Sequence, residues 1–190
     1  GYRRNQPDRC YFCKSELYGR LVELAAEVGV RAVLDGFNRD DRADWRPGRK
    51  AATELGVVSP LDEAGMTKAE VRAAARELGL PNWEKEAAAC LSSRVPYGML
   101  IDPALLGRIE DAEAVLREEG FRQVRVRHGA EIAVLEVAPE QVGWLQDRQV
   151  LARVSGRLRS LGYSGVTVDP GGYRRGSLNV QPATGAADGA

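Results

Sequence analysis

The chain has 190 residues, of which 44% are hydrophobic, 28% charged and 6% aromatic, and this composition excludes a collagen, a disulfide-dense miniprotein and a largely disordered chain. Lysine plus arginine equals aspartate plus glutamate at 27 each, so the formal net charge is zero and we expect no nucleic-acid partner. No run of about 18 apolar residues could cross a bilayer, and no apolar leader opens the chain. We therefore expect a cytoplasmic protein that binds no membrane.

Strands alternate with helices in the first hundred residues. The expected elements, in chain order, are a helix over 15–29, a strand over 31–35, a loop over 36–48, a helix over 49–55, a strand at 57–58 and a helix over 67–78. Ser15 is the expected N-cap of the first helix, and Gly29 its stop. Thr67 and Glu70 form a capping box before the last helix. This alternation predicts an α/β domain with a parallel sheet over 1–100.

The later residues follow a different order. The expected elements are a helix over 104–119, strands over 123–127 and 131–137 around a turn at 128–130, a helix over 147–161 and a strand over 163–169. Such an order is typical of a small α+β domain, which we place at 101–180, with the boundary near residue 100. Residues 181–190 show no apolar periodicity and are expected to be disordered.

Three cysteines form the first candidate site. Cys10 and Cys13 are spaced as C-x-x-C, and Cys90 lies far downstream. In a neutral chain without a secretory leader, this spacing favours a metal or redox site over a structural disulfide. Three thiolates could hold a [4Fe–4S] cluster with one iron left open, or zinc if His128 supplied a fourth ligand. Three unrelated buried cysteines are the simpler alternative.

An acidic loop forms the second candidate site. Asp40, Asp41, Asp44 and Arg46 follow the strand expected over 31–35. Ligands of open α/β sheets bind at the carboxyl ends of the strands, and clustered carboxylates there could hold Mg²⁺ on a nucleotide phosphate. The alternative is a charged loop that is simply solvated.

Two arginines form the third candidate site. Alternation along the strand places Arg125 and Arg127 on one face, about 7 Å apart. Paired guanidinium groups suit a phosphate or a carboxylate. Equally, Glu131 or Glu136 on the partner strand could pair with them across the sheet.

Seven segments occur together in an order that resembles a known family. They are 7–14 (PDRCYFCK), 35–41 (DGFNRDD), 44–48 (DWRPG), 59–61 (SPL), 89–98 (ACLSSRVPYG), 124–128 (VRVRH) and 172–179 (GYRRGSLN). The set resembles the LarE family, ATP-dependent sulfur transferases of nickel-pincer cofactor biosynthesis in the PP-loop ATP pyrophosphatase superfamily. The resemblance covers the chain up to about residue 180.

The resemblance implies a fold and a reaction. It implies a Rossmann-like PP-loop domain, and an enzyme that uses ATP and Mg²⁺ to adenylate the carboxylates of pyridinium-3,5-biscarboxylic acid mononucleotide and then replaces the activated oxygen with sulfur. Adenylation makes chemical sense because a carboxylate is a poor electrophile until its oxygen becomes part of a leaving group. In one branch of the family a cysteine supplies the sulfur, and in another three cysteines hold a [4Fe–4S] cluster that carries an extra sulfide.

The resemblance also implies roles for individual residues. Cys90 matches the position of the sulfur-donating cysteine, and Cys10 and Cys13 place the chain in the cluster branch. The nucleotide side of the site is expected to include Asp40, Asp41, Asp44, Arg46 and Arg94. Arg125 and Arg127 are expected to bind the phosphate of the mononucleotide. The family forms hexamers, so a homo-oligomer is expected.

One family motif is missing from the chain. The phosphate-binding loop, Ser-Gly-Gly-x-Asp-Ser, does not occur in these residues, and the chain begins at Gly1 rather than at methionine. The resemblance thus leads us to expect an N-terminally truncated member that is inactive alone. The alternatives are another PP-loop enzyme, such as a tRNA thiolase or an NAD- or GMP-synthase-like amidotransferase, and a non-enzymatic iron–sulfur or zinc-binding module.

Overall fold

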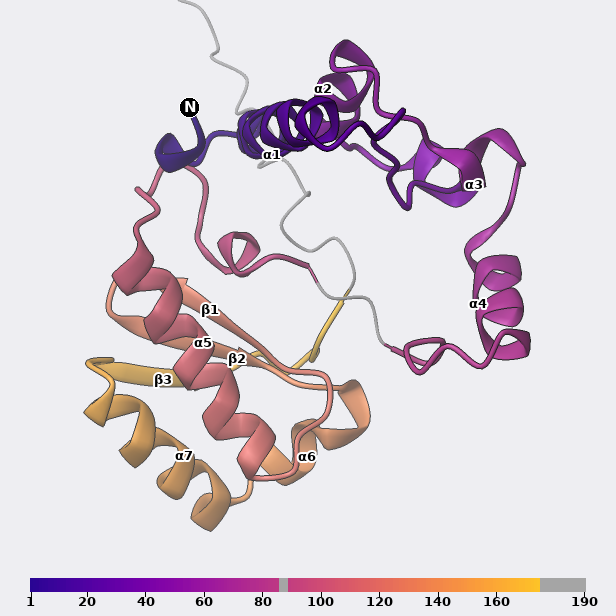
Figure 1. Ribbon diagram of the computed structural model, residues 1–190. Helices are drawn as coiled ribbons and strands as arrows, with labels where there is room; N and C mark the ends of the chain where they lie inside the picture. Colours follow the sequence, from indigo (N-terminus) through magenta and orange to yellow (C-terminus); the bar gives the residue numbers. More distant parts are fainter. Residues whose placement is uncertain (86–88, 175–190) are drawn as a thin grey trace, which may run out of the picture. The chain divides into compact units, whose positions relative to one another are not determined.

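The computed structural model describes residues 1–85 and 89–174, which belong to two compact units, Gly1–Ala88 and Ala89–Ala190 (Figure 1). The division comes before the boundary near residue 100 that the sequence suggests. The reason is that Arg94 already belongs to the second unit, where it pairs with Glu113. The tail expected at 181–190 lies outside the described residues.

The described part of the first unit is mainly helical. Its elements are η1 (Tyr2–Arg4), α1 (Arg9–Glu27), η2 (Arg39–Ala43), α2 (Gly48–Glu54), α3 (Pro60–Glu63) and α4 (Lys68–Glu77). The two short strands expected here are represented by one parallel bridge between Leu34 and Val58. The protein is thus a mixed helix and strand protein, and the Rossmann-like PP-loop fold stays a prediction for this unit.

Helix α1 begins six residues before the N-cap that the sequence suggests. The buried Asn5 accepts a hydrogen bond from the buried Arg9 side chain, and the Arg9 amide donates to the Gln6 carbonyl at 2.9 Å. These contacts start the helix without a side-chain cap at the N-cap position. Ser15 is no cap: its hydroxyl donates to the Tyr11 carbonyl within the helix, at 2.8 Å. Cys10 and Cys13 therefore lie inside α1 rather than in a loop before it.

The capping box of α4 is confirmed. The Thr67 amide donates to the Glu70 carboxylate at 2.7 Å, and the Glu70 amide donates to the Thr67 hydroxyl at 3.2 Å. The helix ends at Glu77, and Gly79 then takes a left-handed conformation with φ of 68°.

The second unit contains a three-stranded sheet and the helices that cover it. Its elements are η3 (Leu91–Arg94), α5 (Pro103–Glu118), β1 (Arg125–Gly129), β2 (Ile132–Glu136), η4 (Pro139–Gln141), α6 (Val142–Leu145), α7 (Arg148–Ser160) and β3 (Gly165–Val168). Strand β2 lies in the middle, antiparallel to β1 and parallel to β3. Helices α5 and α7 contact each other and pack against β1 and β3 (Figure 1). The α-β-β-α-β order expected from the sequence is confirmed.

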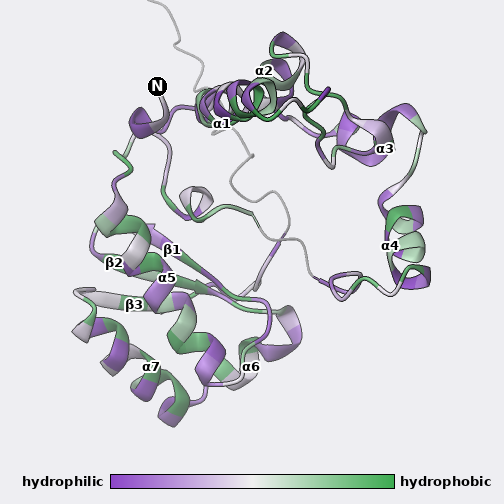
Figure 2. Ribbon diagram, viewed as in Figure 1, coloured by the Kyte–Doolittle hydropathy of each residue, from purple (hydrophilic) through white to green (hydrophobic). Residues whose placement is uncertain are grey.

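The hydrophobic core lies in the second unit. Its cluster includes Leu116, Phe121, Val126, Leu135 and Leu158, all almost completely buried. Figure 2 shows hydrophobic residues, in green, along the helices and strands of this unit. In the described part of the first unit, the buried apolar side chains are Tyr18, Ala51 and Ala52, whereas Leu17, Leu24, Val28, Val30 and Leu34 are exposed. Across the described residues, no helix combines the length and the apolar character that crossing a membrane requires.

Candidate functional site

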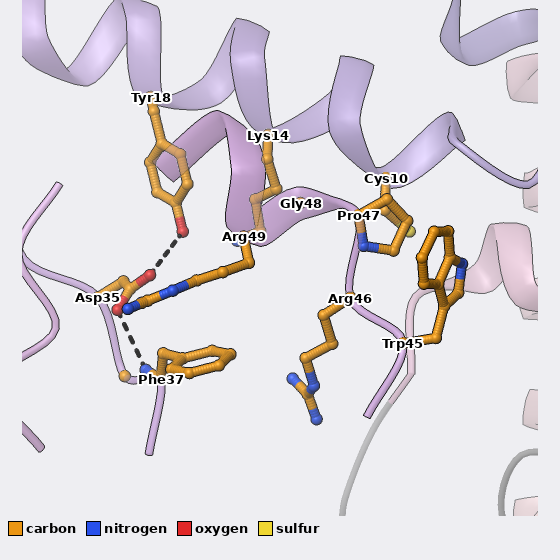
Figure 3. Close-up of a pocket in the computed structure, with 11 residues that line it drawn as sticks. Cys10, Lys14, Tyr18, Asp35, Phe37, Trp45, Arg46, Pro47, Gly48 and Arg49 are labelled. Carbon is orange, nitrogen blue, oxygen red and sulfur yellow. Dashed lines mark hydrogen bonds between the residues drawn. The ribbon is translucent and has the colours of Figure 1, made fainter. Parts of the chain in front are cut away.

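A pocket of about 350 Å³ lies in the first unit, against the amino-terminal half of α1 (Figure 3). Cys10, Lys14 and Tyr18 line it from that helix, and their spacing of four residues places them on one face. The start of α2 approaches α1 closely at Gly48, where a Cβ atom would lie 2.8 Å from Lys14 Cγ and 3.3 Å from the Cys10 carbonyl oxygen. Glycine at this position therefore lets the two helices share the wall of the pocket.

Asp35 organises the opposite wall of this pocket. One carboxylate oxygen accepts from the Tyr18 hydroxyl at 3.2 Å (Figure 3). The other accepts from the Phe37 amide at 3.1 Å and from the Ser59 hydroxyl at 2.6 Å. Burial raises the pKa of Tyr18 and outweighs the opposing effect of Lys14, so the phenol remains a donor to Asp35 at neutral pH.

Arg49 supplies positive charge to the pocket and is held from several sides. Its guanidinium lies 4.2 Å from the centre of the Phe37 ring. It donates to the Ser59 hydroxyl at 2.5 Å and to the Asp62 carboxylate at 3.3 Å. Asp62 also accepts from Arg42 at 2.6 Å. The pocket therefore combines a fixed arginine, an aromatic face and the Lys14 amine, a set that suits a planar anionic ligand.

The acidic loop uses its carboxylates within the protein. Asp41 and Asp44 pair with Arg46 at 2.6 and 3.2 Å. Asp40 accepts from the Lys68 amide at the start of α4, at 2.9 Å. In the described residues, no three histidine, cysteine or acidic side chains gather as a metal site. Each of these carboxylates already contacts a donor or a cation of the protein, and they do not converge on one point. The magnesium site expected from the sequence therefore stays a prediction.

The cysteines are divided between the two units. Cys10 and Cys13 lie three residues apart on α1, so they share a face of the helix. Cys90 belongs to the second unit, where it is exposed, and none of the three cysteines forms a disulfide. The convergence of the three cysteines on one cluster stays a prediction.

Cys90 lies on a short turn that two arginines hold from within the second unit. Arg94 donates to the carbonyl oxygens of Ala89 and Cys90 at 2.9 and 3.0 Å. Arg127 donates to the Ser93 carbonyl at 2.9 Å. Three backbone carbonyl groups of the turn thus accept hydrogen bonds from arginines of the second unit, while Cys90 itself is exposed to solvent.

Arg94 is anchored in turn by a buried carboxylate. It makes a two-pronged contact with Glu113, at 2.6 and 3.2 Å, and both side chains are almost completely buried. Glu113 also accepts from Arg117 at 2.7 Å and from the Val126 amide at 3.2 Å. Arg94, expected on the nucleotide side of the site, thus links the Cys90 turn to α5 and β1 in the second unit.

The two arginines of β1 differ in their surroundings. Arg127 makes a two-pronged ion pair with Glu136, at 2.6 and 3.0 Å, which is the pairing across the sheet that the sequence left open. Arg125 is buried; it donates to the Val124 carbonyl at 2.7 Å, and its guanidinium lies 5.1 Å from the centre of the Tyr173 ring. Burial and the neighbouring charge of Arg94 lower the pKa of Arg125.

Positive charge exceeds negative charge in this part of the second unit. The groups concerned are Arg94, Arg117, Arg125 and Arg127 with Glu113 and Glu136. The charge of Arg94 contributes to the lowered pKa of Arg125, although burial is the larger cause and Glu113 and Tyr173 act in the opposite direction. A bound anion would offset the effect of Arg94, so the cluster is suited to a phosphate or a carboxylate.

Sequence reasoning missed two residues of this arrangement. Glu113 lies in α5 beside Ala112 and one turn from Ile109 and Leu116, all fully buried. A charged residue within an apolar stripe is a signal that could have identified it. Tyr173 lies within the 172–179 motif, but no local pattern indicates its contact with Arg125.

The chain is similar to several known proteins, although no family model matches it. It is 45% identical over 178 residues to an uncharacterized protein of Synechocystis, covering 94% of this chain and 66% of that protein. It is 44% identical over 178 residues to the pyridinium-3,5-bisthiocarboxylic acid mononucleotide synthase of Lactiplantibacillus plantarum, covering 93% and 63%. An uncharacterized protein of Methanocaldococcus jannaschii is 28% identical over 171 residues, covering 90% and 66%.

These similarities extend over almost all of this chain but over less than two thirds of the synthase. They include both units and therefore both candidate regions. The chain belongs to the LarE-type family, that of the pyridinium-3,5-bisthiocarboxylic acid mononucleotide synthase.

Proposed function

We propose that the chain takes part in converting the carboxylates of pyridinium-3,5-biscarboxylic acid mononucleotide into thiocarboxylates for the nickel-pincer cofactor. The observation that carries the proposal is the 44% identity to the synthase over 178 residues. The reaction has two chemical requirements: activation of a carboxylate by ATP, and delivery of sulfur to the activated carbon.

The first unit is the proposed site of activation. The pocket beside α1 offers the Phe37 ring to a flat base, and Lys14 and Arg49 to anionic groups. Asp40, Asp41 and Asp44 are the residues that would hold Mg²⁺, which would neutralise the phosphate charge of ATP. Binding there would require Arg46 to exchange Asp41 and Asp44 for a phosphate oxygen.

The second unit is the proposed site of substrate recognition and sulfur delivery. Arg125 is the proposed phosphate ligand, because an anion there would offset its repulsion with Arg94. Arg127 is bound to Glu136 and to the Ser93 carbonyl, so it would act mainly by holding the Cys90 turn and by adding positive charge. The exposed Cys90 thiol is the proposed sulfur-delivering group.

Cys10, Cys13 and Cys90 are the residues that would hold a [4Fe–4S] cluster, since thiolates are the ligands such clusters require. A bound cluster would supply sulfide at its open iron. The fit rests on three cysteines that form no disulfide, two of them on one face of α1. We further propose that the protein is a cytoplasmic homo-oligomer, a hexamer by its family resemblance.

Titration calorimetry with the pyridinium mononucleotide tests the substrate assignment. We expect binding that weakens about tenfold in Arg125→Ala, since hydrogen bonds to charged groups typically contribute 1.5–3 kcal/mol. Arg159→Ala, an exposed arginine on α7, is the matched control and should bind like the wild type. Tight binding of tRNA with no binding of the mononucleotide would instead favour a tRNA thiolase.

A further inference from the structure

After β3, the chain returns to the end of β2 through a tight turn. The Gly171 amide donates to the Asp169 carboxylate at 2.7 Å, and the Gly172 amide donates to the Asp169 carbonyl at 3.1 Å. The Tyr173 amide then donates to the Val137 carbonyl at 2.7 Å. Tyr173 is therefore fixed by its backbone beside the last residues of β2.

Gly172 makes this return possible. Its φ is 63°, a left-handed conformation, and a Cβ atom would lie 2.8 Å from the Val137 carbonyl oxygen and 3.1 Å from Pro139 Cα. Both neighbours are backbone atoms, so neither can move aside as a flexible side chain would. The path of the chain into Tyr173 thus depends on glycine at 172.

The register of the sheet places Tyr173 against Arg125. Arg125 pairs with Glu136 across β1 and β2, and the next residue of the chain, Val137, is the one that binds the Tyr173 backbone. The Tyr173 ring centre lies 5.1 Å from the Arg125 guanidinium carbon. An aromatic ring at this distance attracts the cation, and a side-chain hydrogen bond also joins Arg125 to Tyr173.

We propose that Tyr173 is a positioning residue that holds the guanidinium of Arg125 in the orientation that binds the phosphate of the substrate. This inference rests on the proposed function for the identity of the substrate, and on the contacts above for the role of Tyr173. The ring restricts the rotamers of a long side chain, the contact that would keep the guanidinium in one orientation. The 172–179 motif would then contribute to substrate affinity through a residue that need not touch the substrate.

The test measures binding of two probes, the pyridinium mononucleotide and inorganic phosphate, to the full chain. The variants are Tyr173→Leu, Tyr173→Phe, Arg125→Ala and the double variant Tyr173→Leu/Arg125→Ala, with Arg159→Ala as control. We expect Tyr173→Leu to weaken binding of both probes about tenfold, because it loses both the ring and the hydrogen bond to Arg125. Tyr173→Phe keeps the ring and loses only the hydrogen bond, so it should weaken binding less, by about threefold. In the Arg125→Ala background, Tyr173→Leu should weaken binding no further. A thermal melt of each variant shows whether it is folded.

The outcomes separate the inference from the proposed function. Full-strength binding of phosphate by folded Tyr173→Leu, or losses that multiply in the double variant, would overturn the positioning role. Wild-type protein that binds phosphate through Arg125 and Tyr173 but does not bind the mononucleotide would contradict the proposed substrate and support the positioning role. Wild-type protein that binds neither probe would overturn both.

Discussion

Removing the carboxylate of Glu113 should destabilise the second unit strongly. Glu113 is completely buried and is the partner of Arg94, which is 3% exposed. Breaking a buried ion pair from one side leaves an uncompensated charge and costs about 3–5 kcal/mol. Small domains are stable by only about 5–15 kcal/mol, so Glu113→Ala should lose a large part of the free energy of unfolding.

Urea denaturation of the full chain would measure the loss, with hydrogen exchange of the Val126 amide as a local reporter. That amide donates to Glu113, so its protection should fall in Glu113→Ala. Arg117→Ala is the matched control: Arg117 donates to the same carboxylate, but its side chain is 50% exposed, so the cost should be at most about 1 kcal/mol. The double variant Arg94→Met/Glu113→Leu should recover much of the stability, because it buries no lone charge.

Two results would refute this reasoning. A cost below about 1 kcal/mol for Glu113→Ala would mean that the ion pair is solvated rather than buried. A double variant as unstable as Glu113→Ala would mean that the glutamate acts through its shape or its bond to β1 rather than through Arg94.

Three further predictions follow from other contacts. Burial, with a smaller effect of Arg108, lowers the pKa of His128 below 6.5, so the folded state favours the neutral imidazole. The urea concentration at the unfolding midpoint should therefore decrease as the pH is lowered from about 7.5 to about 5.5, and it should decrease less in His128→Gln. An equal fall in both proteins would assign the acid sensitivity to other groups. Gly172→Ala should lower the free energy of unfolding by about 1–3 kcal/mol. Gly143→Ala is the control and should leave that free energy unchanged, because no atom lies within 4 Å of its added Cβ. Equal melting temperatures for the two variants would show that the turn at Gly172 tolerates a side chain. Arg127→Ala should destabilise the protein, because it removes the two-pronged pair with Glu136, but it should weaken mononucleotide binding less than Arg125→Ala does. A larger loss of binding in Arg127→Ala, measured by calorimetry, would make Arg127 the phosphate ligand.

Local patterns were enough to predict most elements. The capping box of α4 and the alternation of β1 and β2 are contained within a few residues, and both are present in the structure. The start of α1 was predicted wrongly because it depends on the Asn5–Arg9 contact, for which no capping pattern exists. That error moved Cys10 and Cys13 from a loop into a helix.

Partners distant in sequence could not be predicted in the same way. From the sequence, Arg127 could bind either a phosphate or a carboxylate on the neighbouring strand. The register of the β1–β2 hairpin brings the carboxylate of Glu136 within reach of Arg127. Likewise, the contact between Tyr173 and Arg125 depends on a turn that begins at Asp169 and ends on the Val137 carbonyl. Pairings of this kind follow from packing rather than from spacing.

The proposed sulfur transfer uses Cys90 itself or a cluster that Cys90 would help to bind. The most direct measurement is anaerobic incubation of the iron- and sulfide-reconstituted chain with the adenylated mononucleotide, followed by mass spectrometry of the pyridinium product. Supplying the adenylate tests sulfur transfer separately from the use of ATP. We expect exchange of a carboxylate oxygen for sulfur with the wild type and none with Cys90→Ala. An unchanged carboxylate with the wild type, or equal sulfur incorporation with Cys90→Ala, would contradict it.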